Sequence, residues 1–152
     1  MTALNPSLPG VAPVSPAVRE RDSLRRELVD AQVHVLNMYL DKRSPDDLAV
    51  ALDRLIQCCR ASFEAEEALM ARLRSQADPV HRDRHQAVLE RLEQLRLSLL
   101  DTDRGRLLAN LILIDRELIS HAADARTVEA SEGRAAPASR GPVSPIQPEQ
   151  QH

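Results

Sequence analysis

Apolar residues recur at steps of three and four along most of the chain, which is the spacing of one face of an α-helix. The first such segment covers about residues 17 to 41. Only four glycines occur in the 152 residues, so few positions would interrupt a helix. The pattern therefore predicts an amphipathic first helix that buries its apolar stripe. This stripe consists of Leu24, Leu28, Ala31, Val35 and Met38.

The second segment opens with residues typical of a helix N-terminus. Ser44 is suited to cap the helix, Pro45 to occupy its first position, and Asp46 and Asp47 to face the positive end of the helix dipole. We expect this helix to run to about residue 76. Its inward stripe, which includes one carboxylate, consists of Leu48, Leu52, Leu55, Cys59, Ser62, Glu66 and Leu69.

Two further segments have the same helical character. The third starts at Asp78 and Pro79 and runs to about residue 100, and the fourth starts in the stretch 101–103. Four helices joined by short turns favour an all-α fold, an up-down-up-down antiparallel four-helix bundle. The predicted inner face of the fourth helix consists of Leu107, Leu111, Ile114, Leu118, His121 and Ala125.

The two ends of the chain differ in composition from the part between them. Residues 1–16 and 130–152 contain all of the ten prolines except Pro45 and Pro79, and few large apolar residues. Such segments bury too little apolar surface to offset the entropy of ordering them. We therefore expect disordered Pro-rich tails at 1–16 and 130–152, and a helical bundle domain over 17–129.

Charge and composition exclude several classes of function. The net charge of −3 gives no reason to expect nucleic acid or an anionic membrane as a partner. The N-terminus lacks the pattern of a secretory signal, and no apolar run approaches the ~20 residues that span a bilayer. We therefore expect a cytoplasmic protein. Neither a nucleophile with an obvious base nor a phosphate-binding glycine loop occurs, so we expect no enzyme activity.

Four residues on three predicted helices have the chemistry of a metal site. His81 and His85 are four residues apart and therefore lie on one side of the third helix. Glu66 lies on the inward stripe of the second helix, where an unpaired carboxylate is costly, and His121 extends the stripe of the fourth. In an antiparallel bundle these side chains can meet in the core. Imidazole and carboxylate ligands suit zinc, ferrous iron, manganese or cobalt.

The chain from about residue 22 to residue 126 resembles the hemerythrin and bacteriohemerythrin family of non-haem iron bundles, a family of HHE cation-binding proteins. The motifs of that family are H-F-x-x-E-E, H-x-x-x-H and H-x-x-x-x-D in its second, third and fourth helices. The resemblance implies a bundle that holds two irons with five histidines and two bridging carboxylates, and that binds dioxygen at one iron. It rests on F-x-x-E-E-x-L-M at Phe63 to Met70, on H-x-x-x-H at His81 and His85, and on His121.

Several ligand positions of the family hold other residues in this chain. Ser62 stands where the second helix of the family has a histidine, and Arg126 stands at the bridging aspartate, with Asp124 nearby but on another side of the helix. Two registers of the first-helix motif D-x-x-H-x-x-L are open, and they place Arg25 or Val33 at the ligand position. The resemblance thus implies that one iron has lost its terminal ligands. The set that remains for the other iron is Glu66, His81, His85 and His121.

We therefore interpret the chain as a hemerythrin-like metal-binding protein with a reduced, mononuclear site for iron or zinc. Four protein ligands suit zinc, whereas iron would need added water. One alternative is a metal-free hemerythrin-like bundle that acts as a regulatory or protein-interaction module, in which arginines pair with the buried carboxylate. Another is a divergent bacteriohemerythrin that still binds iron and dioxygen. Glu67 is interpreted as a solvated or rim carboxylate, and Cys59 as a buried hydrophobe, a replacement thiolate ligand or a redox-sensitive thiol.

Overall fold

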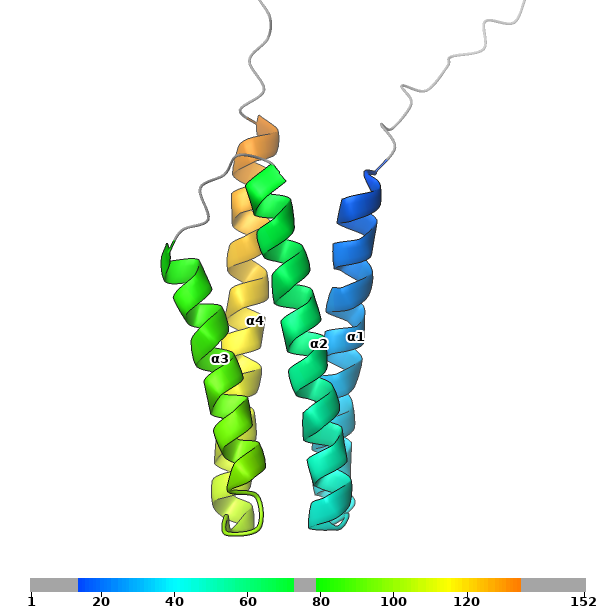
Figure 1. The fold of residues 1–152 in the computed structure, drawn as a ribbon, viewed down its shortest axis with the longest axis vertical. Coiled ribbons are helices and arrows are strands. Elements are labelled where there is room, and N and C mark those ends of the chain that lie inside the picture. Colours follow the sequence, from blue (N-terminus) through cyan, green and yellow to red (C-terminus); the bar gives the residue numbers. More distant parts are fainter. Residues whose placement is uncertain (1–13, 73–78, 135–152) are drawn as a thin grey trace, which may run out of the picture. The chain divides into compact units, whose positions relative to one another are not determined.

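The computed structural model describes residues 14–72 and 79–134, with side chains described as far as residue 122. It consists of four α-helices: α1 (Pro16–Leu40), α2 (Pro45–Arg72), α3 (Pro79–Leu97) and α4 (Arg104–Arg134) (Figure 1). No strand occurs among the described residues. The predicted all-α four-helix bundle is therefore confirmed. The predicted tails lie outside the described residues except where helices extend into them.

Serine and aspartate side chains cap the helix N-termini where the sequence offers them. The Ser44 hydroxyl accepts a hydrogen bond from the backbone N–H of Asp47 at 3.1 Å, so the predicted cap of α2 is present. A second cap was not predicted: the Ser15 hydroxyl accepts from the N–H of Val18 at 3.3 Å, and Pro16 occupies the first turn. The first helix therefore begins inside the segment that we expected to be a tail.

Two helix ends differ from the expected positions. α3 ends at Leu97 instead of about residue 100, because residues 98–101 form a turn. The Thr102 hydroxyl donates a hydrogen bond of 2.7 Å to the carbonyl oxygen of Ser98 and stabilises that turn. α4 continues to Arg134, past the expected boundary at residue 129, since the first proline beyond α4 is Pro137.

The chain divides into two compact units, residues 1–118 and 119–152, and the boundary lies within α4. In the first unit, α2 packs against α1 and against α3. Ion pairs link Asp53 to Arg96 at 2.9 Å and Arg60 to Glu93. Because a later residue of α2 pairs with an earlier residue of α3, the two helices run antiparallel. The described part of the second unit is the continuation of α4.

Hydrogen bonds also join α1 to the first half of α4. The Tyr39 hydroxyl donates to the carbonyl oxygen of Arg104 at 3.1 Å, and the Gln32 amide donates to Asp115 at 3.1 Å. The later residue of α1 pairs with the earlier residue of α4, so these two helices also run antiparallel. The Arg104 guanidinium in addition lies 4.5 Å from the centre of the Tyr39 ring, a cation–π contact.

The core is built almost entirely from aliphatic side chains that the helical period predicted. Leu52 and Leu92 have no exposed surface, and burying one such side chain contributes about 1.5–3 kcal/mol. Tyr39 completes the buried face of α1, whereas Leu24 and Met38 are half-buried. No described helix combines the length and the apolar content required to cross a membrane. The largest fully buried side chains are Leu52, Leu55, Leu92, Ile114, Val35 and Cys59.

Candidate metal centre

The buried face of α2 changes from apolar to polar over its last described turns. Cys59, Ser62 and Glu66 follow one another at steps of three and four and are all buried. The helical period that buries Leu52 and Leu55 therefore also directs the Glu66 carboxylate to the inside, as predicted. Glu66 is only 6% exposed, so its charge needs partners within the protein.

Two nitrogen-bearing side chains approach the same oxygen of Glu66. Oε1 lies 3.4 Å from Nε2 of His81 on α3 and 3.6 Å from Nη2 of Arg25 on α1. Arg25 and Val33 are the two positions that the resemblance left open in the first helix. Arg25 faces the site, whereas Val33 is 51% exposed. The buried carboxylate therefore meets a cation from α1 and an imidazole from α3.

The two histidines of α3 lie together, as their spacing predicted. Their ring centroids are 4.4 Å apart in an edge-to-face arrangement. His85 is 3% exposed, and the His81 side chain is 14% exposed. Both rings therefore have access to a largely water-excluded region next to Glu66.

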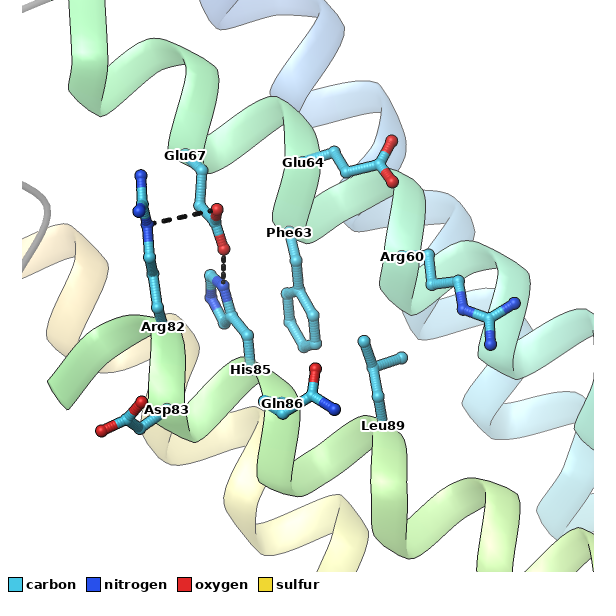
Figure 2. A pocket seen from close by; sticks show the side chains of 9 residues that line it. All are labelled: Arg60, Phe63, Glu64, Glu67, Arg82, Asp83, His85, Gln86 and Leu89. Atoms are coloured by element: carbon cyan, nitrogen blue, oxygen red, sulfur yellow. Dashed lines mark hydrogen bonds and ion pairs between the residues drawn. The ribbon is translucent and has the colours of Figure 1, made fainter. Parts of the chain in front are cut away.

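The orientation of His85 is determined by contacts with α2. The Phe63 ring stacks on it, with centroids 4.0 Å apart and planes 4° apart. Its Nδ1 lies 2.8 Å from Oε1 of Glu67 (Figure 2). Burial lowers the pKa of His85 below its usual value, against the opposite effect of the Glu67 hydrogen bond, and the neighbouring His81 lowers it further. The neutral imidazole, the form that ligates metals, is therefore favoured.

Glu67 is a rim carboxylate, as expected, but it also contacts two residues of α3. Its side chain is 31% exposed, but its two oxygens face two residues of α3: Oε1 faces His85, and Oε2 lies 3.5 Å from Nε of Arg82. One signal in the sequence could have revealed this contact. Phe63 and Glu67 are four residues apart, so they lie on one side of α2, and both side chains contact His85.

A surface pocket of about 330 Å³ lies between α2 and α3 on the side of this contact (Figure 2). Glu67 and Phe63 line it from α2, and His85 and Leu89 line it from α3. Charged side chains surround the opening, with Arg60 and Arg82 among carboxylates. The His85 ring therefore lies at the boundary between this pocket and the histidine cluster.

Three of the four residues predicted as ligands, all in the first unit, offer donor atoms close enough for one metal ion. One ligand atom from each of them lies within 4.8 Å of the others. With metal–ligand bonds of about 2.1 Å, two ligand atoms of a tetrahedral ion would be about 3.4 Å apart. The donors would therefore move closer together to enclose an ion, and their chemistry fits zinc or iron. These three residues are Glu66, His81 and His85, whereas His121, in the second unit, stays a predicted fourth ligand.

The remaining expected site residues fall into two groups. The side chains of Asp124 and Arg126 lie outside the described residues, so the expected cation at the end of α4 stays a prediction. Cys59 is fully buried, and burial together with the neighbouring Cys58 raises its pKa to about 12. The thiol is not among the described donor atoms that converge with Glu66, which favours the buried hydrophobe over the replacement ligand.

Comparisons with protein families, with curated proteins and with solved structures find no match to this chain.

Proposed function

We propose that this chain is a hemerythrin-like metal-binding protein whose reduced site holds a single iron or zinc ion. The ligands would be Glu66, His81, His85 and His121. The observation that carries the proposal is the convergence within 4.8 Å of three of these donors, from Glu66, His81 and His85 of the first unit, next to a mainly aliphatic core. The family resemblance is part of the proposal and adds the expectation of iron.

The donor set determines what each metal would require. Three neutral imidazoles and one carboxylate complete the tetrahedral shell of zinc, as in closed structural sites. Iron in the same place would keep one or two positions for water. A bound divalent ion would also compensate the charge of Glu66 inside the bundle, so binding would stabilise the folded state.

Residues on α1 and α2 favour one ion over two. A second ion on the other side of Glu66 would meet the Arg25 guanidinium, which offers no lone pair and carries a positive charge. Ser62, one turn before Glu66, is buried and supplies only a hydroxyl. Dioxygen carriage by a pair of irons is therefore not part of this proposal.

A metal-free interaction module is the second candidate function. It is favoured by the contacts of Glu66 with Arg25 and His81, which give the buried carboxylate polar partners without a metal. The two candidates differ in how the protein responds to metal. If the protein is a metal-free interaction module, neither a chelator nor added zinc would change its melting temperature.

The deciding experiment is metal analysis of protein purified without added metal, followed by thermal unfolding with chelator, zinc or ferrous iron. We expect one equivalent of metal and a rise in unfolding free energy of about 2.7 kcal/mol at a hundred times the dissociation constant. His85→Ala and His121→Ala should abolish that rise, whereas His34→Ala, at an exposed position of α1, should keep it. Two irons per chain with an oxo-bridge absorption band would overturn the mononuclear site.

A further inference from the structure

We infer that Glu67 is a positioning residue that selects the tautomer of His85 and directs Nε2 toward the ligand cluster. Its Oε1 lies 2.8 Å from His85 Nδ1, at the ordinary distance of a hydrogen bond (Figure 2). A carboxylate is an acceptor only, so the proton of this bond belongs to Nδ1 of the ring. The lone pair of the neutral ring is then on Nε2, at the opposite edge.

The surroundings of His85 make this arrangement specific. Phe63 stacks flat on one face of the ring, so the ring cannot rotate about its long axis without losing that contact. The other oxygen of Glu67 faces Arg82, which holds the carboxylate from the side of the pocket. The chain of contacts thus runs from Arg82 through Glu67 to His85 and the cluster.

The neighbouring carboxylate Glu64 supplies a matched comparison within the same helix. Glu64 and Glu67 both line the pocket between α2 and α3, one turn apart (Figure 2). In the figure the Glu64 side chain points away from His85, whereas that of Glu67 points to its Nδ1. Glu64 and Glu67 therefore share their charge, their helix and the pocket, and they differ in their contact with the His85 imidazole.

Nitrogen NMR of the metal-free protein tests the tautomer directly. In the wild-type chain the His85 ring should show a protonated Nδ1 and an unprotonated Nε2 at neutral pH. Glu67→Ala should give a mixture of tautomers, and Glu64→Ala should leave the wild-type pattern. A His85 ring that carries its proton on Nε2 in the wild-type chain would overturn the inference without any reference to metal.

Metal affinity supplies the second readout, and this part rests on the proposed function. With zinc in competition with a chromophoric chelator, Glu67→Ala should bind 10–100-fold more weakly than the wild type, as is typical when a partner of a ligating histidine is removed. Glu67→Gln keeps an acceptor oxygen and should recover part of that loss, while Glu64→Ala should match the wild type. If the wild type binds zinc and Glu67→Ala binds it with the same affinity, the inference about Glu67 is wrong and the proposed function stands. No zinc binding by the wild type would overturn the proposed function instead.

Discussion

Oε1 of Glu66 lies 3.6 Å from Nη2 of Arg25, so a buried carboxylate of α2 is paired with a cation of α1. Both side chains are largely withdrawn from water, with exposed fractions of 8% and 21%. Removing one partner of such a pair leaves the other charge uncompensated in a region of low dielectric. A substitution of Arg25 should therefore change both the stability of the folded protein and its affinity for metal.

We predict that Arg25→Met destabilises the metal-free protein by about 1–3 kcal/mol, below the cost of breaking a fully buried pair because Arg25 keeps some contact with water. The same variant should bind zinc at least as tightly as the wild type, since the competing guanidinium is gone. Urea unfolding with and without zinc measures both effects. Arg26→Met, at the exposed next position of α1, is the control and should change neither. Weaker zinc binding in Arg25→Met would contradict the prediction.

The pKa of His85 predicts how the stability of the metal-free protein depends on pH. Burial lowers this pKa below its usual 6.5, so the folded protein takes up the proton less readily than the unfolded chain. Stability should therefore be full above about pH 6.5 and fall as the pH decreases toward the folded-state pKa. Urea midpoints between about pH 8 and pH 5 measure this loss, and His85→Gln should reduce it. The prediction would be contradicted if the stability of the wild type rose toward pH 5 while that of His85→Gln did not.

Helical periodicity was sufficient for the fold and for part of the site. It placed Val35, Leu52 and Glu66 on buried faces, and it placed His81 and His85 on one side of α3. These are properties of a single helix, and a period of 3.6 residues determines them.

The remaining features depend on how two helices pack, which no single-helix pattern contains. The choice between Arg25 and Val33 depends on the rotation of α1 against α2. The contact of Glu67 with His85 depends on the separation of α2 and α3. The end of α3 is instead a local feature, because the Thr102 hydroxyl and the Asp101 backbone N–H both donate to the Ser98 carbonyl oxygen.

The two adjacent cysteines should differ sharply in reactivity. Because burial raises the pKa of Cys59 to about 12, its thiol stays protonated near neutral pH, and the thiolate is the form that reacts. Cys58 is only half-buried. We expect iodoacetamide at about pH 8 to modify one thiol in the folded chain and two after denaturation, as measured by intact mass.

Single variants identify which thiol reacts. Cys59→Ala should still take up one label in the folded state, and Cys58→Ala should take up none over the same time. Labelling of Cys59 in the folded protein at the rate seen for Cys58 would show that this thiol is accessible, and the replacement-ligand interpretation would regain support.

The family resemblance predicts that the second metal position can be rebuilt. Arg25 lies beside Glu66, and Ser62 is buried one turn before it, so histidines at these two positions would face the same carboxylate. We expect Arg25→His, Ser62→His and Arg126→Asp together to raise the iron content from one to two per chain, with the absorption band of an oxo-bridged pair. The matched control carries Arg26→His in place of Arg25→His and should keep one iron, since residue 26 is exposed on α1. If both triple variants hold the same amount of iron, the positions do not correspond to those of a two-iron site, and the resemblance carries no information about the ligands.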